Sequence, residues 1–185
     1  MVVLLSGGID SLVCAELARG DGVLKGCVFV DYGHPAQIAE GWKAFAYCGE
    51  RGIPLKVVHV FGLDLGDMGS EKGARVVPCR NAVLLAVAAN AAVGMGADTL
   101  LVGANAADQN EYTDCRRPFL NAMADALGVE VSAPLLHSTK REIISLARGF
   151  GLDRSEAWAC YGPGPEECGE CPSCVHADAG WRDDD

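Results

Sequence analysis

The residues best suited to chemistry lie at the start of the chain, where residues 6–11 read Ser-Gly-Gly-Ile-Asp-Ser. They follow an apolar run at residues 2–5, which predicts a buried parallel strand. Two glycines after a strand predict a tight turn, because glycine adopts left-handed backbone angles freely. We expect a helix next, which Asp10 or Ser11 can cap. Backbone N–H groups and the positive end of the helix dipole would face an anion, so this segment predicts a phosphate-binding loop.

This loop differs from two common nucleotide-binding motifs. It has no lysine and lacks the GxxxxGK[ST] spacing of a Walker loop, and it lacks the third glycine of a dinucleotide fingerprint. It instead resembles the PP-loop of the ATP pyrophosphatases, which split ATP into AMP and pyrophosphate while they activate an oxygen of the substrate. An ordinary glycine-rich turn is the competing interpretation, but such a turn does not require two serines and an aspartate.

Polar residues also follow the later apolar runs. Asp31, Tyr32 and Gly33 close a strand predicted at residues 26–33, and ligands of open α/β sheets bind at the carboxyl ends of strands. We therefore expect these three residues to border the nucleotide, although a buried tyrosine at a strand end is an alternative. Arg80 and Asn81 precede an apolar helix, and a phosphate or carboxylate would be a good partner for the guanidinium.

Residues 104–118 combine acid, amide, phenol and guanidinium groups beside a strand end. This density of hydrogen-bonding groups suits a polar heterocycle, and a solvated loop is the alternative. Lys140 begins a later helix that Ser138 or Thr139 can cap. It lies where a cation could reach a triphosphate, or it is a surface residue without a role.

Four cysteines of the C-terminal tail form a separate motif: Cys160, Cys168, Cys171 and Cys174. Two overlapping C-x-x-C steps with a fourth thiol upstream can close a tetrahedral zinc site. Four thiolates leave no position for water, so the site would be structural and would replace the core that this glycine- and proline-rich tail cannot build. The odd total of 9 cysteines argues against a secreted disulfide framework.

The elements that must position these groups follow from periodicity. Strands are predicted at residues 2–5, 26–33, 55–61, 99–103 and 129–136, with helical patterns between them and a loop at 62–75. The alternation predicts an α/β fold with a doubly wound, five-stranded parallel sheet. We place a PP-loop domain at residues 1–155 and a zinc-binding segment at 156–185. The helical pattern at residues 35–52 predicts core contacts for Ile38, Trp42, Phe45, Ala46 and Cys48.

Composition excludes some functions. The formal net charge of -10 argues against direct binding of nucleic acid, which needs clustered Lys and Arg. No run of about 18 apolar residues occurs, and the chain starts with a core strand instead of a signal peptide, so we expect a soluble, cytoplasmic protein with no membrane partner. The helix at residues 82–93 is apolar nearly all round, so we expect a neighbouring surface, which a homodimer would supply.

Together the motifs resemble the 7-cyano-7-deazaguanine synthase family of the queuosine pathway. The resemblance rests on the PP-loop, the Arg80-Asn81 pair, a Gly-x-Asn-x-x-Asp stretch that leads to Tyr-x-Asp-Cys-Arg, and the four tail cysteines. It covers nearly the whole chain. It implies the adenine nucleotide alpha hydrolase (HUP-like) PP-loop fold and an ATP-dependent C–N ligase that forms AMP and pyrophosphate.

The resemblance also implies a reaction. The carboxylate of 7-carboxy-7-deazaguanine attacks the α-phosphorus of ATP with help from Mg²⁺, and ammonia converts the acyl-adenylate to an amide. A second ATP activates the amide oxygen, and loss of AMP gives the nitrile. Position and charge stabilisation are the contribution of the protein.

Site residues follow from the same resemblance. Pyrophosphate and its metal are assigned to Ser6, Gly7, Gly8, Asp10 and Ser11, and the adenosine to Asp31, Tyr32 and Gly33. Arg80 and Lys140 offset phosphate or carboxylate charge. The deazaguanine is assigned to Asn81, Asn105, Asp108, Tyr112, Asp114 and Arg116. An aspartate suits this ring because its two oxygens accept the N1 and N2 donors in parallel.

Three departures from the family pattern leave alternatives open. The loop at residues 62–75 looks shorter than usual, Cys79 stands where glycine or alanine is commoner, and Ala177 stands where an arginine is frequent. One alternative is a ligase that joins the deazaguanine acyl group to another amine, such as a protein N-terminus, in a modification or antiviral defence system. A non-catalytic, zinc-stabilised nucleotide sensor is a second. A tRNA thiolation enzyme is a third, although the acidic chain has no appended RNA-binding domain.

Overall fold

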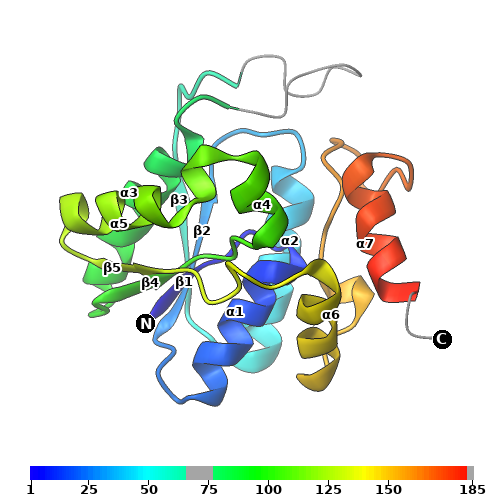
Figure 1. The fold of residues 1–185 in the computed structure, drawn as a ribbon, viewed down its shortest axis with the longest axis horizontal. Coiled ribbons are helices and arrows are strands. Elements are labelled where there is room, and N and C mark those ends of the chain that lie inside the picture. The colour runs from blue at the N-terminus through cyan, green and yellow to red at the C-terminus, as the bar shows by residue number, and fades with distance from the viewer. Residues whose placement is uncertain (66–76, 183–185) are drawn as a thin grey trace.

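A five-stranded parallel sheet lies at the centre of the chain (Figure 1). The computed structural model describes residues 1–65 and 77–182. The strands are β1 (Val2–Leu4), β2 (Gly26–Asp31), β3 (Leu55–His59), β4 (Thr99–Leu101) and β5 (Glu130–Ser132). Their order in the sheet is β3-β2-β1-β4-β5, so the chain winds outward from the central β1 in both directions. The predicted doubly wound fold is confirmed, and its switch point lies between β1 and β4.

Helices cover both faces of the sheet. The longer helices are α1 (Ile9–Gly20), α2 (Gln37–Arg51), α3 (Arg80–Gly94), α5 (Arg117–Leu127) and α6 (Lys140–Gly149). Helices α1, α2 and α6 share one apolar core, and α3 and α5 share the other. Side chains of the central strands alternate between these cores, as Val3 and Val2 do in β1 and Leu101 and Leu100 do in β4. The short helix α4 (Ala106–Glu111) and the turns η1 (Thr113–Cys115) and η2 (Arg154–Glu156) lie in the connections.

The strands are shorter than predicted, most clearly at β5. The apolar pattern predicts a strand to residue 136, but β5 ends at Ser132. Pro134 has no N–H for a strand ladder. The chain instead turns, with the N–H of Leu136 donated to the carbonyl of Ala133. These turns lead directly to α6, where Thr139 caps the helix as one of the two predicted residues.

The predicted cap of the first helix is wrong. Gly8 occupies the N-cap position of α1, without a side-chain hydrogen bond, instead of Asp10 or Ser11. The hydroxyl of Ser11 donates to the Gly8 carbonyl at 2.8 Å, and the Asp10 carboxylate turns towards other partners across the crevice. Neither side chain therefore caps the N-terminal N–H groups of α1.

The predicted core face of α2 is also partly wrong. Ile38, Trp42 and Phe45 are 71%, 66% and 61% exposed, and Ala46 is exposed as well, whereas Cys48 is buried as predicted. Ala44 and Tyr47 complete the buried face, and Gly41 approaches the ring of Phe29 in β2. Periodicity identified the helix, but it could not tell which flank of the apolar stripe the sheet covers.

The tail contains a helix that was not expected. The glycine- and proline-rich tail shows no helical periodicity, but Pro172–Arg182 forms α7, which packs on α6 (Figure 1). Glycine permits this close contact, since a Cβ at Gly180 would lie 2.4 Å from Ile144 Cδ1. The backbone N–H of Trp158 donates to the Gly7 carbonyl, so the tail also contacts the PP-loop. The domain boundary at residue 155 stays a prediction.

Three further expectations concern the outside of the molecule. No helix among residues 1–65 and 77–182 has the length and hydropathy to cross a membrane. The predicted loop at 62–75 lies mostly outside the described residues. In α3, Val93 is 58% exposed, whereas Leu85, Ala88 and Ala92 are buried against the sheet. The homodimer stays a prediction.

Cys79, at the N-cap of α3, has a left-handed backbone with φ of 57°. Among the described residues it is the one non-glycine residue with positive φ. A Cβ in this conformation destabilises the folded state by about 1–2 kcal/mol. Glycine removes this strain but loses about 0.5–1 kcal/mol more conformational entropy on folding. We therefore expect Cys79→Gly to raise the free energy of unfolding by about 0.5–1 kcal/mol in urea denaturation. Cys79→Ala keeps the Cβ and should leave the free energy of unfolding unchanged. An equal increase in both variants would contradict backbone strain at Cys79.

Candidate functional site

A cavity of about 720 Å³ opens at the carboxyl ends of the central strands. Its walls come from the ends of β1, β2 and β4, the first turns of α1, α3 and α6, the α4 region and the tail. The switch point of a doubly wound sheet is the usual place for a ligand. Twelve predicted site residues line this cavity: Ser6, Gly8, Asp10, Ser11, Tyr32, Arg80, Asn81, Asn105, Asp108, Tyr112, Asp114 and Lys140.

Hydrogen bonds between its own residues fix the loop at residues 6–11. The Ser11 hydroxyl accepts the Ser6 N–H at 3.1 Å and lies 3.2 Å from the Ser6 hydroxyl, which in turn accepts the Gly8 N–H. Gly103, after β4, approaches so closely that a Cβ there would lie 2.9 Å from the Ser11 nitrogen. The N-terminus of α1 therefore faces the cavity in a fixed position, as an anion site requires.

Gly7 is the most constrained position of this loop. Its φ is +79°, and a Cβ would lie 2.4 Å from the backbone oxygen of Glu40. We expect Gly7→Ala to lower the melting temperature and to weaken MgATP binding at least about tenfold, because the loop or α2 must shift. Titration calorimetry measures the binding.

Gly20→Ala is the matched control, since Gly20 ends α1 and no atom lies within 4 Å of its Cβ position. Alanine there should add up to about 1 kcal/mol of stability and leave binding unchanged. Unchanged binding in Gly7→Ala would show that the close approach is unimportant.

Asp10 is the centre of a polar cluster that links three elements. Its carboxylate oxygens lie 2.6 and 2.8 Å from Lys140 Nζ at the start of α6. Asn105 Nδ2 donates to the same carboxylate at 2.8 Å. The Asn105 Oδ1 accepts two N–H groups of α4 as its cap. All polar atoms of the buried Asn105 side chain are thus used to hold Asp10 and α4.

Arg80 provides a second cation at the opposite wall. Burial opposes its charge, but Tyr32 and other nearby groups outweigh burial and raise the pKa of Arg80. Burial raises the pKa of Tyr32, which therefore stays neutral and can donate a hydrogen bond. The Tyr32 ring stacks on His34 at 4.6 Å, and His34 Nε2 lies 3.1 Å from Glu40. A chain of partly buried polar side chains thus lies beside the guanidinium.

The polar segment at residues 104–118 folds into α4 and η1 instead of a plain loop. Asp108 accepts the Asn105 N–H at 3.0 Å, and burial raises the pKa of Asp108. Burial and the neighbouring Glu111 raise the pKa of Tyr112 to about 12. Asp114 lines the cavity close enough to Arg80 to interact with it electrostatically. Two acids, a neutral phenol and amides thus face the same space.

Four of the residues predicted to bind ATP or the deazaguanine do not line the cavity: Gly7, Asp31, Gly33 and Arg116. Gly7 lies behind the loop, and the Asp31 carboxylate is 3.1 Å from His59 and accepts the Gly33 N–H. The exposed Arg116 donates to the carbonyls of Gln109 and Asn110 and so ends α4. The roles given to the site residues stay predictions.

Sequence reasoning missed several residues of the cavity wall: His34, Glu40, Trp158, Tyr161, His176 and Trp181. His34 directly follows the predicted Tyr32 and Gly33, which was a usable signal. The others come from α2, from the tail and from α7, which no local pattern connects to the PP-loop. The tail therefore forms part of the site wall and also carries the four predicted metal ligands.

The four predicted metal ligands come together. The sulfur atoms of Cys160, Cys168, Cys171 and Cys174 all lie within 4.8 Å of one another. The Cys160–Cys168, Cys171–Cys174 and Cys168–Cys174 separations are 3.5, 3.4 and 3.9 Å. Four sulfurs about 2.3 Å from one tetrahedral zinc lie about 3.8 Å apart, so the cluster fits this ion. Backbone N–H groups donate to three of the sulfurs, which suits thiolates.

Comparisons with known proteins agree with this geometry. The protein-family model described as "Queuosine biosynthesis protein QueC" matches residues 64–184. The chain is 32% identical to the 7-cyano-7-deazaguanine synthase of Thermoplasma acidophilum over 94% of its own length and 84% of that protein. It is 36% identical to the synthase of Anaeromyxobacter sp. over 94% of its own length and 88% of that protein. The alignment with the first spans 202 positions, more than the 185 residues of this chain, so the relative carries insertions.

Among solved structures, the chain resembles the U34-tRNA thiolase NcsA from Methanococcus maripaludis, which was solved with its [4Fe-4S] cluster. The TM-score is 0.59 at 18% identity, with 96% of this chain and 62% of the thiolase covered. The NH3-dependent NAD synthetase from Campylobacter jejuni is similar at a TM-score of 0.57 and 18% identity, with 84% of this chain and 65% of that chain covered. At 18% identity these two structures show a similar fold and nothing more. That shared fold confirms the predicted PP-loop architecture.

Proposed function

Because this chain belongs to the queuosine biosynthesis protein QueC family, we propose that it uses ATP to convert 7-carboxy-7-deazaguanine to 7-cyano-7-deazaguanine. The observation that carries this proposal is the cavity itself. It brings the N-terminus of α1, two cations and a set of purine-suited polar groups to one switch point. The names of the relatives support the substrate, and the geometry supports ATP-dependent activation.

The phosphates of ATP would lie against the loop at residues 6–11. Backbone N–H groups at the start of α1 face that position, and Lys140 lies beside it. In the free protein the ammonium group of Lys140 donates to the Asp10 carboxylate. When the nucleotide binds, phosphate oxygens would compete with Asp10 for this ammonium group. Asp10 offers the oxygen ligands that Mg²⁺ prefers. When bound, Mg²⁺ offsets the charge of the departing pyrophosphate.

The carboxylate of the deazaguanine would then attack the α-phosphorus, releasing pyrophosphate and giving an acyl-adenylate. Ammonia attacks the acyl carbon, and AMP leaves to give the amide. The amide oxygen then attacks the α-phosphorus of a second ATP, which releases a second pyrophosphate. Loss of AMP with a proton from nitrogen gives the nitrile. The chain contributes by holding the acid in line and by stabilising negative charge through Arg80 and Lys140.

For the deazaguanine ring, Asp114 is the better supported of the two predicted acids. The Asp108 carboxylate already accepts the Asn105 N–H in the capping box of α4. Asp114 lines the same wall beside Arg80. Its two oxygens could accept the neighbouring N1 and N2 donors of the ring.

We expect Asp114→Asn to raise the KM for the deazaguanine about 10- to 100-fold, since an amide cannot accept both donors. The Kd for MgATP should stay the same, which steady-state kinetics and calorimetry measure separately. Asp125→Asn on the exposed side of α5 serves as the control. A weaker Kd for MgATP together with an unchanged KM would contradict the assignment.

The whole proposal is tested by incubating the purified chain with 7-carboxy-7-deazaguanine, ammonium, Mg²⁺ and ATP. Mass spectrometry should detect the nitrile and AMP, while 7-deazaguanine without the carboxylate should give no AMP. AMP without any deazapurine product would contradict the proposal. An amide that accumulates, or a deazaguanine mass on a protein amine, would favour the ligase that uses another acceptor; Ala177 lines the cavity wall where such an acceptor would pass.

A further inference from the structure

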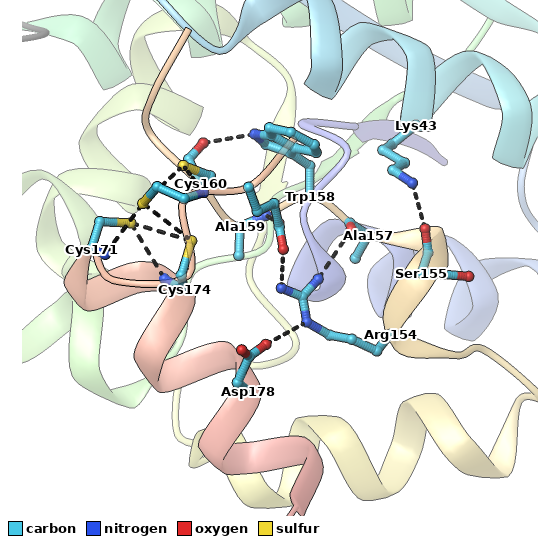
Figure 2. A network of polar contacts seen from close by, with 12 residues as sticks. Lys43, Arg154, Ser155, Ala157, Trp158, Ala159, Cys160, Cys171, Cys174 and Asp178 are labelled. Carbon is cyan, nitrogen blue, oxygen red and sulfur yellow. Dashed lines mark hydrogen bonds and ion pairs between the residues drawn. The ribbon is translucent and has the colours of Figure 1, made fainter. Parts of the chain in front are cut away.

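The tail segment between η2 and the cysteine cluster contacts both the cluster and the PP-loop. Figure 2 shows Trp158 and Cys160 in this segment. Trp158 is the residue that touches both the cluster and the loop. Its backbone N–H donates to the Gly7 carbonyl at 2.9 Å. Its indole N–H donates to the carbonyl of Cys160, a cluster residue, at 2.7 Å. One residue thus joins the predicted metal site to the most constrained glycine of the loop.

The Trp158 ring is held by packing as well. It is 8% exposed and lies in a small apolar core with Ala36, Cys160 and Cys174. Ala36 is the N-cap of α2, the helix that also supplies the Glu40 oxygen against Gly7. The ring therefore fills the space between the cysteine cluster and the start of α2. Any rearrangement of the cluster would move the ring, and with it the backbone that holds Gly7.

Arg154 fixes the same segment from its other end (Figure 2). Its guanidinium donates to the Ala157 carbonyl at 3.3 Å and to Asp178 of α7 at 3.2 Å, and it pairs with Glu167 in the cysteine loop. Glu167 also accepts the N–H of Ala159, next to Trp158. At 26% exposure, the Arg154 side chain is partly withdrawn from water. One cation thus links Ala157, the neighbour of Trp158, to the cysteine loop and to α7.

The conformation of Gly7 matters because the N–H groups that follow it must point into the cavity. Gly7 has left-handed angles, and a glycine peptide without an anchor can rotate at little cost. When a loop must be reordered on binding, the apparent affinity is lowered to the fraction of molecules in which the loop already has the binding conformation. The Trp158–Gly7 hydrogen bond supplies that anchor from outside the loop.

We propose that Arg154 and Trp158 are positioning residues that hold the PP-loop in its anion-binding conformation, so that an intact metal-loaded tail sets the affinity for MgATP. Neither residue needs to touch the phosphates. This inference rests on the proposed function only in that the loop binds the phosphates of ATP.

The test is titration calorimetry of MgATP into the zinc-loaded full chain, without deazapurine, with zinc content measured for each variant. We expect Arg154→Met and Trp158→Ala to weaken binding about tenfold while one zinc per chain is retained. Arg182→Met is the matched control, because Arg182 also pairs with Asp178 but is 79% exposed and away from Trp158. Its Kd should equal that of the wild type.

Trp158→Phe is the conservative variant: its smaller phenyl ring keeps an aromatic side chain in the apolar core but loses the indole N–H bond to Cys160. We expect about threefold weaker binding, and it decides the outcome if the other variants do not fold. Wild-type affinity in the folded, zinc-loaded variants would overturn the inference alone. If the variants bind MgATP more weakly as expected but the wild type forms no AMP with the deazaguanine, the proposed function alone is overturned. A wild-type chain that binds no MgATP would overturn both.

Discussion

Replacing Asp10 with asparagine is expected to lower the rate of AMP formation by about 100-fold or more. The carboxylate holds Lys140 through both oxygens and accepts the Asn105 amide at 2.8 Å. An amide of the same shape cannot neutralise Lys140, cannot offer a charged ligand to Mg²⁺, and turns its own N–H₂ group towards a cation or towards the Asn105 donor. The loss therefore falls on the step in which charge develops on the phosphates.

The change is isosteric, so the melting temperature should move little, and a fall in activity can be assigned to the site. Single-turnover release of AMP measures the step directly. Asp125→Asn, in α5 and exposed, is the control and should keep full activity. Activity within about threefold of the wild type would show that Asp10 holds neither the metal nor Lys140 in the reacting complex.

Loss of the metal from the cysteine cluster is expected to have the largest effect on stability. Structural zinc sites contribute about 10–16 kcal/mol of apparent binding free energy, and 1 kcal/mol moves the melting temperature of a chain of this size by about 2–4 °C. We therefore expect Cys174→Ser, or a strong chelator, to lower the melting temperature by about 10 °C or more. Cys174 is buried beside Cys171 and Trp158, so the loss would spread into α7.

Cys79→Ser is the matched control, because Cys79 is an exposed cysteine outside the cluster. It should retain one zinc per chain and the melting temperature of the wild type. Atomic absorption gives the metal content, and differential scanning calorimetry gives the melting temperature. A Cys174→Ser variant with full zinc and an unchanged melting temperature would rule out the four-cysteine site.

The sheet could be predicted because its signals are local. Five apolar runs, each closed by polar residues or glycine, mark buried parallel strands in any context. Where β5 ends and which flank of α2 is exposed depend on neighbours that the local pattern does not contain. The helix α7 escaped notice since its apolar residues are few, and its contact with α6 depends on the absence of a side chain at Gly180.

The site was predictable to the extent that its residues follow strand ends. Twelve of the predicted residues line one cavity, because parallel strands deliver their C-terminal segments to the same edge. The contribution of Trp158 could not be foreseen, since a backbone hydrogen bond to Gly7 leaves no trace in residue types. Asn105 differs from Trp158, because its residue type and its place after β4 marked it as a site residue. Its hydrogen-bond partners, which the sequence does not give, show that it holds Asp10 and caps α4.

The bond between Trp158 and Gly7 also fixes an order of events during synthesis. Chains emerge from the ribosome N-terminus first, and their early segments begin to fold before the rest is made. The loop after β1 is translated before strands β2 to β5, and its anchor Trp158 comes after all of them. A nascent chain can therefore build most of its sheet while it is still unable to hold a nucleotide firmly.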